Sequence, residues 1–271
     1  MPLFLRYKLS TQVPVEVEGV IPSAVRGRSL AEVERLPIFH GNQKLRLADA
    51  FSISGDTNDD RVQFEGNLSG VHWIGAKLDG GVIHVAGDAG RHLGSEMTAG
   101  EILVDGDASD WIGGEMRGGS IRVGGHAGHL VGAAYRGSPK GMTGGTILID
   151  GDAGNEVGHS MRRGLIAIGG NVGDFVALNF IAGSVFVMGR CGIRPAAGMR
   201  RGTLAFLGDS PPPLLPTFRS GGVGRLTFLC LYLRELARLG FPVDDGLAEA
   251  NYQMHHGDLL AGGRGEVLFR A

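Results

Sequence analysis

The sequence predicts an all-β fold in which the middle of the chain winds into a parallel β-helix of stacked coils. Three observations predict it: an excess of glycine, segments that recur at a fixed spacing, and apolar residues at fixed places within each segment. Glycine supplies 48 of the 271 residues, well above the usual share of about 7%. Collagen would need a strict three-residue period, and disorder is disfavoured by 43% hydrophobic residues and a net charge of −2. A repeat with glycines at its turns explains the composition.

The repeat has a period of 19 residues. Gly87 opens the segment GDAGRHLGSEMTAGEILVD, and Gly106 opens GDASDWIGGEMRGGSIRVG. Further copies begin at Gly125, Gly151, Gly170 and Gly189, and a degenerate copy spans about residues 66–86. The copy at Gly125 is longer because it has extra residues at 136–141. We therefore expect roughly seven coils; neither a six-residue period nor a propeller period of about 40 residues fits.

Apolar columns indicate how the coils stack. Near the end of each copy, two apolar residues flank one residue that points outward, as at Ile102 and Val104. The same pair recurs from Ile83 and Val85 to Leu204 and Phe206. Another inward column consists of Met97, Met116, Met142, Met161, Phe180 and Met199. Stacked about 4.8 Å apart, such coils bury a continuous apolar core.

The flanks divide the chain into three expected parts: a β-rich cap at 1–60, the β-helix at 61–209 and an extension at 210–271. Strand-like stretches in the cap are Leu3–Leu9, Val13–Val17 and Lys44–Ile53. Pro211–Pro213 end the repeat, because proline cannot donate to a sheet ladder.

The extension is expected to hold one helix and one strand. Leu226–Leu239 has a helical pattern and is apolar around most of its circumference, so we expect it to be buried on several sides, against the end of the coils or a neighbouring subunit. A final strand is expected at Gly265–Arg270.

Composition excludes several function classes. The near-neutral charge argues against a general nucleic-acid binder. Cys191 and Cys230 are the only cysteines, which leaves no disulfide framework and no cysteine metal site. Neither a secretory leader nor a long apolar run is visible, so we expect a cytoplasmic protein that does not enter a membrane.

Repeated acidic residues offer two interpretations. Asp88, Asp107 and Asp152 occupy the second position of their copies, and Asn171 occupies it in another. They could form a ladder that binds cations, or they could hydrogen-bond their own turn backbone. We favour the second interpretation, because Asp and Asn are common turn residues.

The histidines and short motifs do not predict a catalytic centre. His92, His126, His129 and His159 lie near coil corners but not all at one repeat position, so we expect no metal site. His255 and His256 are expected at the surface or an interface. No G-x-S-x-G elbow or phosphate-binding loop occurs, and the many GxG strings are repeat corners. We expect no catalytic residue.

Basic residues form the one distinctive polar pattern. Arginines follow the methionine column on alternate coils, and the longer copy adds two more basic residues. The set is Arg117, Arg162, Arg163, Arg200 and Arg201, with Arg136 and Lys140. Such a row could be a solvated edge protected by charge. It could also bind a polyanionic tail or the acidic surface of a partner through guanidinium contacts.

The coils resemble two families: the C-terminal β-helix of glutamate synthase large subunits and the C subunits of formylmethanofuran dehydrogenases. The flanking segments GNQKLRLADAFSISG at Gly41–Gly55 and GDLLAGGRGEVLF at Gly257–Phe269 are similar to the pattern of those C subunits. Within that family the chain looks most like the C subunits of the formyltransferase/hydrolase complexes of methylotrophic bacteria. The resemblance covers nearly the whole chain and implies that the β-helix is right-handed.

The resemblance also implies a role. Such complexes move a formyl group from tetrahydromethanopterin to a methanofuran-type carrier, whose family has glutamyl-rich tails, and release formate. In that family formyl transfer belongs to the D subunit and hydrolysis to the amidohydrolase-like A subunit, so the A, B and D subunits are the expected partners. The C subunits have no known catalytic motif, and this chain is expected to bind no cofactor itself. Alternatives are a glutamate-synthase-type scaffold and a subunit of a molybdenum or tungsten dehydrogenase.

Overall fold

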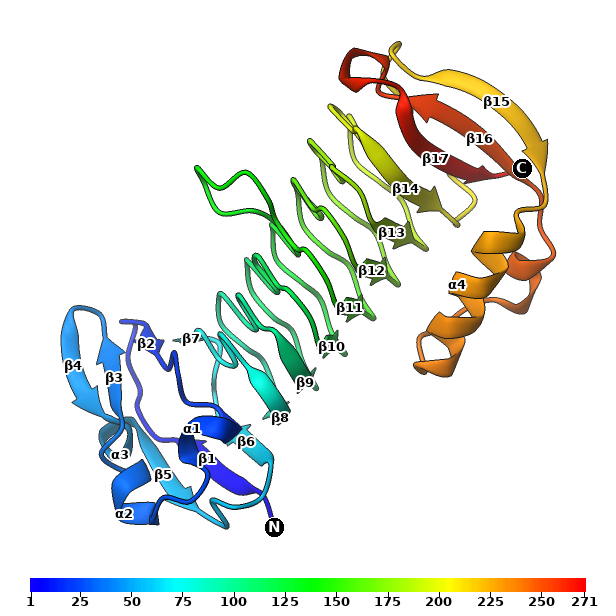
Figure 1. The fold of residues 1–271 in the computed structure, drawn as a ribbon. Coiled ribbons are helices and arrows are strands. Elements are labelled where there is room, and N and C mark those ends of the chain that lie inside the picture. Colours follow the sequence, from blue (N-terminus) through cyan, green and yellow to red (C-terminus); the bar gives the residue numbers. More distant parts are fainter.

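The protein is mostly β, and one mixed sheet runs along its whole length (Figure 1). The computed structural model describes all residues, 1–271. The sheet has 13 strands in the order β15-β16-β17-β14-β13-β12-β11-β10-β9-β8-β6-β1-β5. Its repeat strands are β6 (Arg61–Glu65), β8 (Asp79–Ala86), β9 (Ala99–Val104), β10 (Ser120–Val123), β11 (Thr146–Ile149), β12 (Leu165–Ile168), β13 (Ser184–Val187) and β14 (Arg201–Phe206).

These repeat strands pair in parallel, each with the equivalent strand of the next copy. Ile102 lies opposite Ile121, and Ile121 lies opposite Ile147. The long copy keeps this register because its extra residues project as a loop away from the sheet (Figure 1). A second row of single parallel bridges joins the opening turns of the copies, from Ala89 to Cys191. The predicted period and stacking are confirmed.

The predicted inward columns form the core. Ile83, Ile102, Met97 and Met116 are all fully buried. The larger of two core clusters has 51 buried residues and extends from Leu3 to Phe269. Each coil buries its own apolar side chains only against its neighbours, so stability grows with stacking.

Besides the strand and the single bridge, each coil has a third side, which is a run of tight turns. The first residue of this run has a left-handed backbone in every copy: Trp73, His92, Trp111, Leu130, Glu156, Phe175 and Arg194. Two residues later stands a glycine or an alanine. At Gly113, with φ +59, an added Cβ would lie 2.5 Å from Cδ1 of Ile147, so that this corner requires glycine for both conformation and space.

The N-terminal segment extends the long sheet and forms a second, smaller sheet beside the first coil. Strand β1 (Leu3–Tyr7) pairs in parallel with β6 and antiparallel with β5 (Phe51–Ser54). A four-stranded sheet is formed by β2 (Val15–Glu16), β3 (Pro37–His40), β4 (Gln43–Arg46) and β7 (Val71–His72).

This segment also contains three short helices that were not predicted from the sequence: α1 (Pro22–Val25), α2 (Leu30–Val33) and α3 (Leu47–Ala50). The prediction of one strand over Lys44–Ile53 was wrong. The Asp49 carboxylate accepts the backbone N–H of Arg46 at 2.9 Å and starts α3, so the chain forms β4, a helical turn and then β5.

The C-terminal segment leaves the repeat at the prolines and then returns to it. Strand β17 (Arg264–Arg270) pairs in parallel with β14, in the register that a further copy would have. Strands β16 (Tyr252–Gly257) and β15 (Arg219–Gly224) then complete the sheet in antiparallel fashion. The predicted final strand is confirmed.

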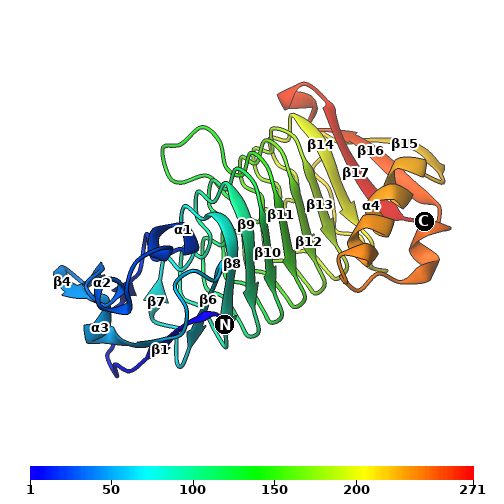
Figure 2. The same ribbon diagram turned by 60° about the horizontal axis from the view of Figure 1, so that its bottom comes forward.

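The predicted helix is also present, as α4 (Thr227–Arg238), and this chain itself buries one of its sides. It lies on the outer face of the sheet (Figure 2), with Leu229, Leu233 and Leu236 buried on one side only. On its other side Leu231 is 62% exposed. These leucines pack on outward residues of four strands: Leu148, Ala167, Phe186 and Ala205. Burying each leucine contributes about 1.5–3 kcal/mol.

Candidate functional site: the arginine edge

The predicted arginines lie along one corner of the coils, which we call the arginine edge: Arg117, Arg162, Arg163, Arg200 and Arg201. Arg162 N–H donates to the Met142 carbonyl at 2.9 Å, and Arg200 N–H donates to the Phe180 carbonyl at 2.7 Å. Arg117 makes the equivalent bond to Met97. Because Arg117, Arg162 and Arg200 make the same backbone hydrogen bond to the preceding coil, they occupy the same position of the repeat. They recur on every second coil, about 10 Å apart.

Four of these arginines surround a shallow hollow. Arg162 and Arg163 border it on one coil, and Arg200 and Arg201 border it two coils further on. The intervening coil contributes only Ile181, Ala182 and Gly183, and these smaller side chains leave a space of about 480 Å³. The arginines were predicted from the sequence but the hollow was not, since it arises because the coil between them has no long polar side chain there.

The four arginines around the hollow have no acidic partner in the chain. All four are exposed, and none lies within 4.0 Å of a carboxylate of the chain. Arg117 differs, because its guanidinium lies 3.7 Å from the Glu96 carboxylate. The unpaired positive charge is therefore concentrated on the C-terminal coils.

The count of charged residues in the coils agrees with this concentration of positive charge. Residues 116–208 contain ten Lys and Arg residues but four acidic ones, Asp150, Asp152, Glu156 and Asp174, although the whole chain carries −2. The four acids already have partners. Asp150 pairs with Arg122, Asp152 and Asp174 accept backbone N–H groups, and Glu156 lies 3.0 Å from His159.

The loop residues Arg136 and Lys140 lie on the protruding segment of the long copy, where both are exposed. The start of this loop is fixed by Tyr135. Its ring stacks on Trp111 at a centroid distance of 4.9 Å, and its hydroxyl lies 3.2 Å from Nδ1 of His92. The loop therefore begins over the N-terminal coils.

A further arginine of this edge was missed. Arg264, at the start of β17, pairs in register with Arg201. The signal was present in the sequence, since Gly265, Val267 and Phe269 repeat the spacing of Gly202, Leu204 and Phe206. The long interruption between the two segments concealed it.

The acidic turn residues do not leave a cation site. Asp107 Oδ1 accepts the backbone N–H of His126 at 2.7 Å, and Asp152 Oδ1 accepts that of Asn171 at 2.6 Å. The favoured interpretation was correct in kind but wrong in detail, because each side chain bonds the next coil rather than its own turn. His126 takes part too, since its Nδ1 accepts the N–H of Asp152 at 3.0 Å.

A second ladder of the same kind runs three residues further along each copy. Asp110, His129, Asn155 and Asp174 each accept a backbone N–H from the next coil at 2.8–2.9 Å. Two of the predicted candidate histidines are thus structural acceptors in these ladders. No group of three or more His, Cys, Asp or Glu residues is arranged to hold a metal ion.

The remaining histidines lie in separate surroundings. His92 stacks on Trp73 at 4.0 Å, and burial lowers its pKa to about 4. His159 lies beside Glu156, with its Nδ1 3.0 Å from the carboxylate. His255 packs against Phe269 at 5.1 Å, and burial lowers its pKa, whereas His256 is exposed.

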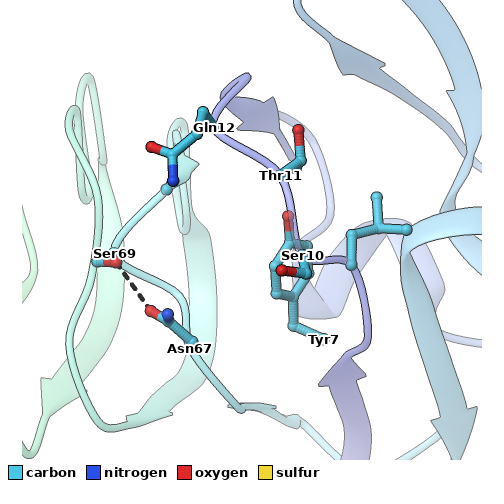
Figure 3. Close-up of a pocket in the computed structure, with 8 residues that line it drawn as sticks. Tyr7, Ser10, Thr11, Gln12, Asn67 and Ser69 are labelled. Carbon is cyan, nitrogen blue, oxygen red and sulfur yellow. Dashed lines mark hydrogen bonds between the residues drawn. The ribbon is translucent and has the colours of Figure 1, made fainter.

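A larger hollow of about 640 Å³ lies near the N-terminal end of the coils (Figure 3). Its polar lining includes Tyr7, Ser10, Thr11, Gln12, Asn67 and Ser69. Ser69 donates a hydrogen bond to Asn67 at 2.8 Å. None of these lining side chains carries a formal charge at neutral pH, so the arginine hollow is the better candidate for a charged ligand.

The arginine edge presents positive charge and hydrogen-bond donors, but the residues that line its hollow include no group for catalysis. Guanidinium groups donate paired hydrogen bonds to carboxylates and stay protonated. No nucleophile, general base or metal-ligand cluster lies among the residues that line the hollow. Fold and site together define a class: a glycine-rich protein of stacked repeats with an edge of exposed arginines.

Comparison with known proteins assigns the family. The model of the GXGXG-motif family matches residues 71–212, which is more than half of the chain. The chain therefore belongs to the GXGXG-motif family. It is also similar, at 36% identity and a TM-score of 0.92, to a chain in the structure of the formyltransferase/hydrolase complex (FhcABCD) from Methylorubrum extorquens in complex with methylofuran. That similarity covers 99% of both chains.

Curated relatives agree with the expected resemblance. The chain is homologous to the C subunit of the molybdenum-containing formylmethanofuran dehydrogenase 1 of Methanothermobacter wolfeii, with 40% identity over 87 residues. It is 34% identical over 95 residues to the C subunit of the tungsten-containing formylmethanofuran dehydrogenase 2 of the same organism. These matches cover about a third of this chain, but only 22% and 35% of the relatives.

Proposed function

We propose that this protein is a structural, non-catalytic subunit of a complex that transfers a formyl group to a methanofuran-type carrier and hydrolyses the product to formate. The observation that carries the proposal is the similarity to a chain of the methylofuran-bound formyltransferase/hydrolase complex, because it extends over 99% of both chains. The lack of a metal-ligand cluster and of a nucleophile in the arginine hollow is consistent with a subunit that supports chemistry elsewhere.

The proposal specifies partners and architecture. The partners are a formyltransferase (the D subunit), an amidohydrolase-like protein (the A subunit) and the B subunit of the same complex, in the cytoplasm. No helix of the chain is both long enough and apolar enough to cross a membrane. We propose that the β-helix is right-handed with about seven coils, and that it occupies residues 61–209 between a cap at 1–60 and an extension at 210–271.

The arginine edge is proposed to hold the acidic tail of the carrier, with Arg136 and Lys140 of the loop as further contacts. Support comes from the four unpaired guanidinium groups around the hollow. A flexible tail with several carboxylates could contact successive arginines about 10 Å apart. The acidic surface of a partner would use the same groups.

The second candidate is a dehydrogenase-type complex. It is favoured by the names of the curated relatives, which are molybdenum- and tungsten-containing formylmethanofuran dehydrogenases. The local matches to those relatives are shorter than the match to the formyltransferase/hydrolase chain, so the hydrolase-type complex is the first proposal.

The first test is co-purification of the tagged chain from its native host, followed by mass spectrometry. Recovery of a formyltransferase and an amidohydrolase-like protein supports the hydrolase-type complex. Recovery of a partner that contains molybdenum or tungsten supports the dehydrogenase. A chain that purifies alone contradicts both.

The second test reverses charge at the hollow. The double variant Arg162→Glu/Arg200→Glu should lower carrier use by about tenfold, with a weaker effect at high salt, because the tail loses two favourable contacts and meets two repulsive ones. The matched control is Arg219→Glu/Arg234→Glu, which changes two exposed arginines on β15 and α4. Equal carrier use by both variants, with complexes intact, would leave the row as a solvated edge.

A further inference from the structure

An exposed leucine pair forms a small apolar tip at the C-terminal end of the molecule. The tip is the short 3-10 turn η2 (Leu259–Ala261). Leu260 is 87% exposed, the highest value of any large hydrophobic residue in the chain, and Leu259 is 45% exposed. Nothing in the chain covers them.

The tip is an insertion in the arginine edge. The Asp258 N–H donates to the Met199 carbonyl at 3.1 Å, so Asp258 stacks on the last coil in the place that Arg200 occupies one step earlier. Arg264 then pairs with Arg201. Residues 259–263 therefore project from the edge between these two places, next to Arg201 and Arg264, which have no acidic partner in the chain.

Hydrogen bonds within the tip and to neighbouring segments fix its conformation. Asp258 is only 5% exposed, and its two carboxylate oxygens accept N–H groups from Leu260 at 3.0 Å and Gly198 at 3.1 Å. The Gly263 N–H donates to the Asp258 carbonyl at 2.8 Å, and the Leu259 N–H donates to Thr217. A rigid exposed leucine loses little conformational entropy when it is covered, which favours binding.

We propose that the Leu259–Leu260 tip docks into an apolar socket of another protein of the complex, and that acidic residues on the rim of this socket pair with Arg264, which does not line the arginine hollow. This rests on the proposed function, since it requires a complex. A carboxylate-rich tail would gain nothing from a leucine, whereas a protein pocket would bury it. An anchor ringed by unpaired charges is the pattern of an interface hot spot with a polar rim.

The test compares two exposed leucines in the tagged full-length chain expressed in its native host. Leu260→Ser should reduce recovery of one partner about tenfold or more, as loss of a hot-spot anchor does. Leu231→Ser changes a 62% exposed leucine on α4 and should leave recovery unchanged. Leu260→Met should restore most of the binding, because it keeps the apolar contact.

The outcomes separate the tip from the wider proposal. Equal recovery of all partners by Leu260→Ser and the unchanged chain overturns the tip interface and leaves the proposed function intact. Failure of the unchanged chain to recover any partner overturns both. If the purified chain instead forms dimers that Leu260→Ser abolishes, the socket belongs to a second copy, and the proposal of a different partner protein is wrong. A melting temperature shared by all variants establishes that folding is unchanged.

Discussion

The N-terminal and C-terminal coils have the same interior but opposite outer faces. Inward residues of β8 and β13 are both aliphatic, Ile83 and Val85 in one and Val185 and Val187 in the other. The residue between them is His84 in β8, which pairs with Asp105 at the surface, and Phe186 in β13, which is fully buried beneath α4. The same backbone therefore supports an open face at one end and a covered face at the other.

Arg122 marks the boundary between the two regions. Its guanidinium bonds the Asp150 carboxylate at 3.1 Å and the carbonyl oxygens of Leu239 and Gly240 at 2.9 Å, where α4 ends. Inward positions therefore define the coil, whereas the single outward position between them determines which element packs on its outer face.

The largest expected effect tests this difference directly. Phe186→Ala should lower the free energy of unfolding by about 3–5 kcal/mol, because it leaves a cavity between the sheet and α4. The matched change His84→Ala should alter it by less than about 0.5 kcal/mol. Urea unfolding measures both, and hydrogen exchange should show faster opening of α4 in the first variant only. Similar losses in both variants would show that the two faces are energetically alike.

The next effect concerns the interior that both regions share. Gly113→Ala should cost about 2–4 kcal/mol, because alanine disfavours the left-handed backbone and its Cβ meets Ile147. Gly70→Ala is the control, since an added Cβ there has open space and the φ angle is ordinary. Thermal unfolding distinguishes them; a neutral Gly113→Ala would mean that the corner relaxes easily.

A smaller effect is expected in the ladders that connect the two regions. Asp152→Ala should cost about 1 kcal/mol, because the backbone N–H of Asn171 loses its acceptor. Asp209→Ala, at a residue with a 91% exposed side chain, is the control and should cost almost nothing. Chemical denaturation at neutral pH measures the difference. Equal costs would mean that water replaces the side-chain acceptor.

The smallest effect is a pH dependence of the N-terminal coils. Burial lowers the pKa of His92 to about 4 from its usual 6.5, so the unfolded chain takes up the proton first as the pH falls. The stability that comes from neutral His92 is fully present above pH 6.5 and is lost as the pH falls towards 4. Hydrogen exchange in β8 and β9 should accelerate over that range, and His92→Phe should reduce the change. Residues 165–206 serve as the internal control; equal acceleration there would assign the effect to other groups.

Much of the fold was predictable because the repeat makes local and global patterns agree. Each inward column is visible in the sequence, and the paired strands confirm it. The helix α4 and the strand β17 were predicted for the same reason, since each has its own periodicity. Lys44–Ile53 was not, because one side-chain cap from Asp49 outweighed the strand-like pattern.

The candidate site was predictable only as a set of residues. Alternate spacing placed Arg162 and Arg200 on one edge, and the hydrogen-bond register agrees. The hollow between them depends on the small side chains of Ala182 and Gly183, and Arg264 joins the edge only because a distant segment adds a strand. Neither relation is a local pattern.

The period, the buried columns and the positions of the corner glycines follow from the sequence alone, because a coil that repeats every 19 residues presents the same side chains to the same neighbours. The places of the non-repeating parts depend on contacts formed in the folded chain. The tertiary structure sets α4 on the outer face of the C-terminal coils, Tyr135 on Trp111 and the leucine tip beside Arg264. These contacts join residues far apart in the chain, and they form because the stacked coils offer a long surface with several apolar and charged places to dock.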